Sequence, residues 1–353
     1  VIIFGKLDQY RGEYRMVNPV VDLIGDKTGK FIPVYAQSGK AGLSTWEFCN
    51  WTKDALDKSK VRGFAEPLPS AIREQYDLVS RDNAYSSIHN PKNLGEMLTA
   101  RKRLVFDELL RIQLLLLARK RQLELATQGI SHDFSGDLVN KLIESLPFEP
   151  TNAQSKAIAE IFQDLRASYP MHRLLQGDVG SGKTLVAIAA LLSVVEAGKQ
   201  GSIMAPTEVL AEQHFVSAKE LLGSFILMDS TNLLGERKLN ISLLTSQTSE
   251  KDTKEIRAKL RRGEIDIIVG THSLIQESVE FADIGLAVVD EQHRFGVDQR
   301  AALRNKGNSA AIPDLLVMTA TPIPRTAAMT VYGDLDVSIL NELPEGRIPV
   351  ETR

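Results

Sequence analysis

Eight consecutive residues combine three glycines, a lysine and a threonine at a spacing suited to holding phosphate. They follow a strand-like apolar run at 172–176 and precede a run at 185–192 that is typical of a helix. Glycines let the backbone wrap a phosphate, and the helix that begins after them points its free N–H groups at it. The eight are Gly177, Asp178, Val179, Gly180, Ser181, Gly182, Lys183 and Thr184. We predict that they bind a nucleoside triphosphate, because a chance glycine-rich turn fits this strand–loop–helix order poorly.

Two neighbouring acidic residues could hydrolyse the bound nucleoside triphosphate. The apolar run at 284–289 is short enough for a buried parallel strand, and it ends in Asp290 and Glu291. Ligands of α/β sheets bind at the carboxyl ends of the strands. We expect Lys183 to contact the β- and γ-phosphates, and Thr184 and Asp290 to hold Mg²⁺. Glu291 would orient or deprotonate the attacking water. The alternative is a strand that simply ends in solvated acids.

Composition sets broad limits on the rest. The chain has 353 residues, 43% of them hydrophobic and 25% charged, which is ordinary for a soluble protein of two or three domains. The single cysteine, Cys49, excludes an internal disulfide and suits a reducing cytosol. The first residues show no signal peptide, and the apolar run at 114–118 is far too short to cross a membrane.

Charge alone would not suggest nucleic acid, since the net charge is −3. One local exception lies between Met97 and Arg121, where seven basic residues stand against two acidic ones. Such a run is most often a solvated helix face, and a nucleic-acid patch is the alternative.

Three regions follow one another along the chain. Runs at 1–7, 14–17 and 31–35 are typical of strands, and 43–145 is helical. Ser44 and Glu47 predict a capping box, and the apolar spacing of Val105, Leu109, Ile112, Leu116 and Leu123 predicts a long helix over 93–126 with a core stripe. Strand-like runs at 172–176, 201–205, 241–245, 265–270, 284–289 and 314–319 alternate with helices, which indicates a parallel sheet.

These motifs resemble a known family. D-E-x-H at 290–293, A-P-T-E at 205–208 and T-A-T-P at 319–322 resemble the first motor lobe of a superfamily 2 helicase. The longer blocks D-E-Q-H-R-F-G at 290–296 and M-T-A-T-P-I-P-R-T at 318–326 are similar to RecG, the family of ATP-dependent DNA branch-migration helicases. L-P-E-G-R at 343–347 resembles that family's linker. The resemblance is strong over 146–353 and weaker over 1–145.

The resemblance implies further site residues. Phe148 would stack near the nucleotide base and Gln154 would hydrogen-bond its edge. His293, Thr319 and Thr321 would couple the γ-phosphate to DNA, although threonine at a strand end also has ordinary β propensity. Two strand-to-helix turns would hold DNA phosphates, and an aromatic and basic loop would meet a DNA junction. Their residues are Pro206, Thr207, Thr271 and His272 in the turns, and Tyr10, Arg11, Tyr14 and Arg15 in the loop.

One site departs from the family pattern. Where L-L-T-G-S is usual, this chain has L-L-T-S-Q at 243–247, so a glycine that would let the backbone approach a phosphate is absent. We expect the phosphate contact there to be weaker or differently formed.

The predicted fold is an α/β RecA-like parallel sheet, a P-loop NTPase lobe, preceded by a partial OB-like β-barrel segment and a helical connector. The boundaries are 1–42 for the OB-fold wedge, 43–145 for the connector, 146–345 for the ATP-binding lobe and 346–353 for the start of a linker. We expect the second motor lobe and its arginine finger to be absent, so that these residues alone bind Mg-ATP weakly and turn it over near background.

The predicted function is an ATP- and Mg²⁺-dependent translocase on double-stranded DNA that remodels branched DNA such as stalled forks and Holliday junctions. The resemblance implies a monomer in the bacterial cytoplasm, associated with the nucleoid and not with a membrane. Three alternatives stay open. One is a transcription-repair coupling translocase, whose motif is D-E-E-H; another is a DExH enzyme acting on RNA; the third is a nucleotide-switched DNA-binding module without turnover.

Overall fold

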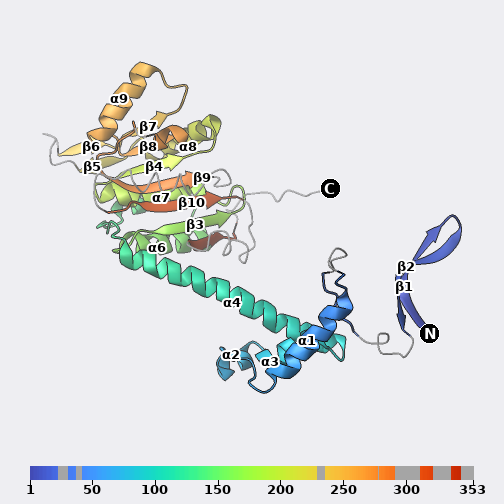
Figure 1. The fold of residues 1–353 in the computed structure, drawn as a ribbon. Coiled ribbons are helices and arrows are strands. Elements are labelled where there is room, and N and C mark those ends of the chain that lie inside the picture. The colour runs from blue at the N-terminus through green and yellow to red at the C-terminus, as the bar shows by residue number, and fades with distance from the viewer. Residues whose placement is uncertain are drawn as a thin grey trace. The chain divides into compact units, whose positions relative to one another are not determined.

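The computed structural model describes residues 1–22, 31–36, 42–228, 235–276, 278–290, 311–320 and 335–342. The chain divides into two compact units, Val1–Leu114 and Leu115–Arg353, and the boundary falls inside one long helix (Figure 1). No helix of the described residues is long and apolar enough to cross a membrane.

The first unit begins with an antiparallel hairpin of β1 (Ile2–Tyr10) and β2 (Glu13–Asp22). Its two-residue turn places Arg11 at φ 55° and Gly12 at φ 87°, the left-handed pair that matches the twist of hairpin strands. Both predicted strands are confirmed and are longer than expected.

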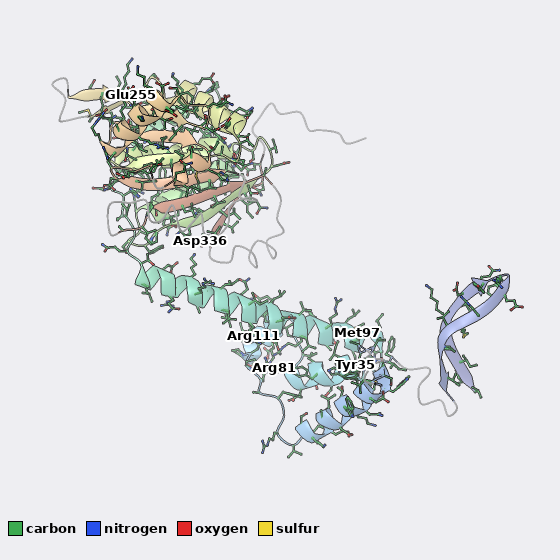
Figure 2. The ribbon with its side chains drawn as sticks, turned by 45° about the horizontal axis from the view of Figure 1, so that its top comes forward. Tyr35, Arg81, Met97, Arg111, Glu255 and Asp336 are labelled. Carbon is green, nitrogen blue, oxygen red and sulfur yellow. The ribbon has the colours of Figure 1, made fainter. Side chains whose placement is uncertain are left out.

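The third expected strand, at 31–35, is wrong, because the described residues 31–36 form no strand. Contacts with the following helices hold this segment instead. The Tyr35 hydroxyl and His89 Nδ1 lie 2.6 Å apart, and their rings stack at 5.9 Å between centroids. Thr45 Oγ1 donates to the Tyr35 carbonyl at 3.3 Å. Tyr35 is labelled among the helices of this unit in Figure 2.

Four helices follow: α1 (Thr45–Ser59), α2 (Ser70–Gln75), α3 (Arg81–His89) and α4 (Leu94–Ala126). The predicted capping box of Ser44 and Glu47 is present, and the long helix lies within one residue of its expected bounds. The expected core stripe on α4 is wrong at two positions, since Val105 and Leu109 are 44% and 42% exposed.

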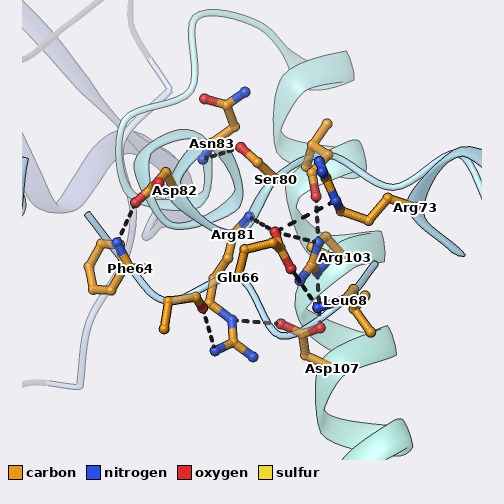
Figure 3. Close-up of polar contacts among 12 residues, drawn as sticks. Phe64, Glu66, Leu68, Arg73, Ser80, Arg81, Asp82, Asn83, Arg103 and Asp107 are labelled. Atoms are coloured by element: carbon orange, nitrogen blue, oxygen red, sulfur yellow. Dashed lines mark hydrogen bonds and ion pairs between the residues drawn. The ribbon is translucent and has the colours of Figure 1, made fainter. Parts of the chain in front are cut away.

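The packed face of α4 centres instead on Ala100 and Arg103, both fully buried. Arg103 belongs to the basic run that is usually solvated, so that interpretation fails for this residue. Its guanidinium meets carboxylates of Glu66 and Asp107 inside the helical unit (Figure 3).

The described residues of the second unit form a seven-stranded sheet in the order β11-β3-β10-β9-β4-β8-β7. All its neighbouring strands run parallel. The bounds are His172–Gly177 for β3, Gln200–Met204 for β4, Ile241–Leu244 for β7, Ile267–Gly270 for β8, Ile284–Asp290 for β9, Asp314–Thr319 for β10 and Asp336–Leu340 for β11. The six predicted strands of a RecA-like lobe are confirmed. The strand β11 and a separate antiparallel pair, β5 (Ile226–Met228) and β6 (Glu236–Lys238), were not predicted.

Helices cover this sheet: α5 (Asp137–Ser145), α6 (Asn152–Leu165), α7 (Lys183–Glu196), α8 (Glu208–Leu222) and α9 (Glu250–Arg261). Alternate residues along each strand enter two separate apolar clusters, one with Leu175 and Val288, the other with Leu174 and Val289. The sheet is therefore buried on both faces, which explains its continuous apolar strands. Figure 1 shows α9 beyond β7 and α6 by β3.

The segment that follows α4 is anchored to the lobe by buried polar groups. His132 Nε2 and Asp314 Oδ2 lie 2.8 Å apart with both side chains at most 1% exposed, and Asp314 Oδ1 accepts from the Met171 N–H at 2.6 Å. Glu196, at the end of α7, accepts from several backbone N–H groups at the start of α5. These bonds fix the segment at 129–138 to the lobe.

The buried carboxyl of Asp314 makes stability depend on pH. Burial raises the pKa of Asp314 to about 6, although the bonds from His132 and the Met171 N–H oppose that shift. A folded pKa above the unfolded value of 3.8 means that the folded state holds the proton more tightly. The contribution of Asp314 to stability is therefore present below pH 3.8 and lost as the pH rises through 6, by about 3 kcal/mol.

We expect Asp314→Asn to remove this part of the pH dependence. Hydrogen–deuterium exchange of peptides that contain Met171 and β10, followed from pH 4 to 7 and corrected for intrinsic exchange rates, measures it. Opening should become easier with rising pH in the unsubstituted chain and change less in the variant. Identical pH profiles would contradict the assignment.

Candidate functional site

The parallel strands of the sheet end side by side, and the predicted site residues follow those ends. Thr319 on β10 pairs with Gln176 on β3, one residue before the phosphate loop, and Met318 pairs with Asp290 on β9. Since neighbouring strands lie about 4.8 Å apart, Asp290 is only two strand spacings, about 10 Å, from the end of β3. The structure thus brings the phosphate loop, Thr319 and Asp290 to one edge of the sheet.

The phosphate loop has the backbone of a cradle. Gly180 and Gly182 have φ of 79° and 84°, which side chains disfavour. A Cβ on Gly177 would lie 2.4 Å from Ser181 Oγ, so glycine is required there as well. Lys183 Nζ donates to the carbonyls of Gly177 and Asp178 at 2.8 and 2.9 Å, which folds the lysine over the loop. The buried Ser181 hydroxyl has no hydrogen-bond partner among the described residues.

Gln154 lies directly against this loop. Its Nε2 donates to the Ser181 carbonyl at 2.8 Å, and its Oε1 accepts from the N–H of Thr151 at 3.0 Å, the helix cap of α6. Gly182 has no room for a side chain because a Cβ would lie 2.2 Å from Gln154 Nε2. Each end of an amide can make a second hydrogen bond, so the adenine contact of Gln154 stays a prediction. Phe148 is 44% exposed, and its stacking role likewise stays a prediction.

Asp290 is the last residue of β9, and its carboxylate forms a hydrogen bond with a histidine. His214, on α8, places Nε2 2.7 Å from Asp290 Oδ2, and their side chains are 11% and 12% exposed. The predicted residues Glu291, His293 and Thr321 lie outside the described residues, as does the linker motif at 343–347.

The turns predicted to meet DNA lie along the same edge on the next strands. Pro206 and Thr207 follow β4, and Thr271 and His272 follow β8. Thr207 Oγ1 accepts from the N–H of Leu210 at 3.3 Å and caps α8, and a hydroxyl also has a proton to donate. The predicted nucleotide-site residues follow β3 and β9, and the predicted DNA-binding residues follow β4 and β8, so the two groups occupy two halves of one edge that meet where β9 pairs with β4.

The carboxylate of Glu208 holds the turn at 243–247, where the glycine usual in the family is absent. Glu208 accepts from the Ser246 N–H at 3.2 Å and from Gln247 Nε2 at 2.7 Å, and it also bonds the Ser246 hydroxyl. Bonds from the side chains of Ser246 and Gln247 lower the pKa of Glu208. The turn after β7 is thus tied to the first turn of α8.

The aromatic and basic loop belongs to the first unit, at the tip of the β1–β2 hairpin. Tyr10 and Tyr14 are 50% and 76% exposed. The Arg15 guanidinium lies 4.1 Å from the centre of the Tyr10 ring and Arg11 lies 5.3 Å from it. An exposed ring flanked by cations suits a nucleic acid, whose bases stack and whose phosphates are negative.

Sequence reasoning missed His214 and Glu208 as site residues. Glu208 stands inside the A-P-T-E motif, and His214 follows two helical turns after Thr207, so a helical projection of 207–222 was the available signal. Nothing in the sequence indicated that His214 would meet Asp290, because that contact depends on the order of β9 and β4.

The arrangement can bind a phosphate chain and one hard cation. The backbone N–H groups of the loop and the positively charged ammonium group of Lys183 can bind the phosphates. Thr184 and Asp290 supply the oxygen ligands that Mg²⁺ prefers. No cluster of three or more acidic, histidine or cysteine ligands occurs in the described part of the chain.

Comparison with known proteins identifies the class. The profile of the DEAD/DEAH box helicase family matches residues 151–330, just over half of the chain. The chain therefore belongs to the DEAD/DEAH box helicase family.

Within that class, the particular proteins it is similar to are ATP-dependent DNA helicases named RecG. The protein of Synechocystis sp. is 44% identical over 92% of this chain and 37% of its own length, and that of Aquifex aeolicus is 40% identical over 100% and 44%. A solved structure of RecG bound to a three-way DNA junction superposes with a TM-score of 0.67 at 37% identity, covering 99% of this chain and 45% of that one. The predicted resemblance to RecG is confirmed. The chain spans about 40% of the length of these relatives.

Proposed function

We propose that this chain is part of an ATP-driven translocase on double-stranded DNA that remodels branched DNA. One observation carries the proposal: a phosphate cradle, an acid and two threonine-bearing turns share one edge of a RecA-like sheet. Nucleotide chemistry and DNA contact can therefore affect each other through a few strand ends. The similarity to a RecG protein solved with a bound three-way DNA junction supports branched DNA as the substrate.

The chain's own residues divide the work. The loop from Gly177 to Thr184 wraps the phosphates, and Lys183 leaves the two backbone carbonyls to neutralise their charge. Thr184 and Asp290 would hold the cation, which would screen charge on the phosphates. Glu291 orients the attacking water, and Gln154 and Phe148 hold the base.

DNA is held at two places in the proposal. Pro206, Thr207, Thr271 and His272 contact phosphates without reading sequence, and Thr319, Thr321 and His293 relay the nucleotide state to them. The hairpin residues Tyr10, Arg11, Tyr14 and Arg15 meet the junction as part of an OB-like wedge, and 43–145 connects that wedge to the lobe at 146–345. We further propose that the protein acts as a monomer in the bacterial cytoplasm, associated with the nucleoid.

Binding of a fluorescent ATP analogue and of labelled DNA tests the proposal. We expect Mg²⁺-dependent nucleotide binding, and tighter binding to a three-way junction than to linear duplex or single-stranded RNA, with affinity that falls as salt rises. Arg11→Ala with Arg15→Ala should weaken junction binding and leave nucleotide binding unchanged. Preference for single-stranded RNA would favour an RNA helicase, and absence of nucleotide binding would refute the proposal.

A further inference from the structure

We infer that His214 is a positioning residue that fixes the carboxylate of Asp290 for cation binding. The inference rests on the proposed function, because it assigns a task within that nucleotide site. Its basis is the 2.7 Å contact between His214 Nε2 and Asp290 Oδ2, made by side chains that are 11% and 12% exposed. A carboxylate is an acceptor, so Nε2 carries the proton in this contact.

The bond leaves one carboxylate oxygen committed and the other available. Oδ2 accepts from His214, so Oδ1 is the oxygen that Asp290 can present to a cation at the strand end. A carboxylate without such a partner can rotate about its terminal bond, whose torsion is broad. Some side chains hydrogen-bond a metal-ligating residue without touching the metal. Removing such a side chain typically weakens metal affinity about 10–100-fold.

The histidine itself is held firmly because its helix is anchored at both ends. Thr207 caps α8 at its first turn, and Glu208 ties that turn to Ser246 and Gln247. Further along, Ala218 and Leu222 of α8 are fully buried in the core of the lobe. The packing of α8 therefore fixes the position of His214. The hydrogen bond from His214 in turn fixes the orientation of the Asp290 carboxylate.

Manganese binding tests this role without relying on turnover. Mn²⁺ is titrated in the presence of a non-hydrolysable ATP analogue, and free Mn²⁺ is followed by electron paramagnetic resonance. We expect His214→Phe to weaken Mn²⁺ binding about 10-fold. His214→Gln keeps an N–H donor and should restore most of the affinity. Gln213→Ala, at the exposed neighbouring position of α8, is the matched control and should bind as the unsubstituted protein does.

Each remaining outcome decides a different question. Equal Mn²⁺ affinity in His214→Phe and the unsubstituted protein would overturn the inference and leave the proposed function standing. Equal losses in His214→Phe and His214→Gln, with a lowered melting temperature in both, would also overturn it, because general damage to α8 would then explain the effect. No binding of Mn²⁺ with the nucleotide analogue to the unsubstituted protein would refute the proposed site itself.

Discussion

Replacing Lys183 with alanine is expected to weaken binding of an ATP analogue by about 100-fold, since a charge-assisted hydrogen bond contributes ~1.5–3 kcal/mol and the lysine meets more than one phosphate oxygen. In the structure Lys183 Nζ donates to two backbone carbonyls, of Gly177 and Asp178, at 2.8 and 2.9 Å. A phosphate chain offers the ammonium negative oxygens in place of these neutral ones, so the lysine is better satisfied with nucleotide bound. Isothermal titration calorimetry with Mg²⁺ and the analogue measures the change.

Lys199, just after the C-terminal end of α7, provides a matched control for the substitution of Lys183. Lys199 follows α7 and pairs with Asp283, away from the loop that α7 begins. Lys199→Ala removes the same charge from the chain and should leave nucleotide affinity unchanged. Comparable losses in both variants would show that net charge, rather than contact in the cradle, governs binding. Unchanged affinity in Lys183→Ala would refute the assignment of the loop.

The lobe could be predicted from sequence because its signals are local. Each strand of the parallel sheet is a short apolar run between polar turns, and the phosphate loop fixes the direction of β3 and α7. The predicted strands at 172–176 and 314–319 match β3 and β10 nearly residue for residue. Strand β11 was missed since its five residues include Asp336 and Ser338, which interrupt the apolar pattern.

What could not be predicted depends on contacts between distant segments. Residues 31–35 form a strand-like apolar run, yet Tyr35 contacts His89 and the segment packs on helices. The pairing of His214 with Asp290 arises because β4 and β9 are neighbours in the sheet, an order that no local pattern states. The burial of Arg103 could not be predicted either, because in the sequence it belongs to a basic run that is usually solvated.

Replacing Arg103, whose side chain is fully buried, with alanine is expected to destabilise the helical unit by about 2–3 kcal/mol, because the partly exposed carboxylates of Glu66 and Asp107 lose charge-assisted hydrogen bonds. Arg103 Nη2 donates to Glu66 Oε1 at 2.6 Å, Nε donates to Asp107 Oδ1 at 2.9 Å, and Nη1 donates to the Val79 carbonyl at 2.8 Å. Asp107 also accepts from Arg81 Nε at 3.2 Å. Figure 3 shows how these groups join the segment before α2, the start of α3 and the middle of α4.

The chain offers a direct reporter for this unit. Both tryptophans, Trp46 and Trp51, lie on α1, so their fluorescence during urea unfolding follows the unit that contains Arg103. Arg101→Ala is the control, because Arg101 is an exposed arginine on the same helix and its loss should change stability little. Equal unfolding free energies for Arg103→Ala and Arg101→Ala would contradict the importance of the buried network.

Acid should reduce the difference between the Arg103→Ala variant and the unsubstituted chain. Burial of Glu66 opposes its ionisation, but bonds from Arg103 and from the N–H groups of Arg81 and Leu68 outweigh burial and lower its pKa from 4.5 to about 2. A depressed pKa stabilises the fold above pH 4.5, and that stabilisation is lost as the pH falls toward 2. The gap between the two unfolding curves should therefore narrow over this range, because protonated Glu66 no longer depends on Arg103. A gap that stayed constant from pH 5 to pH 2 would show that Arg103 stabilises the unit through its packing and its bond to Val79, and not through the charge of Glu66.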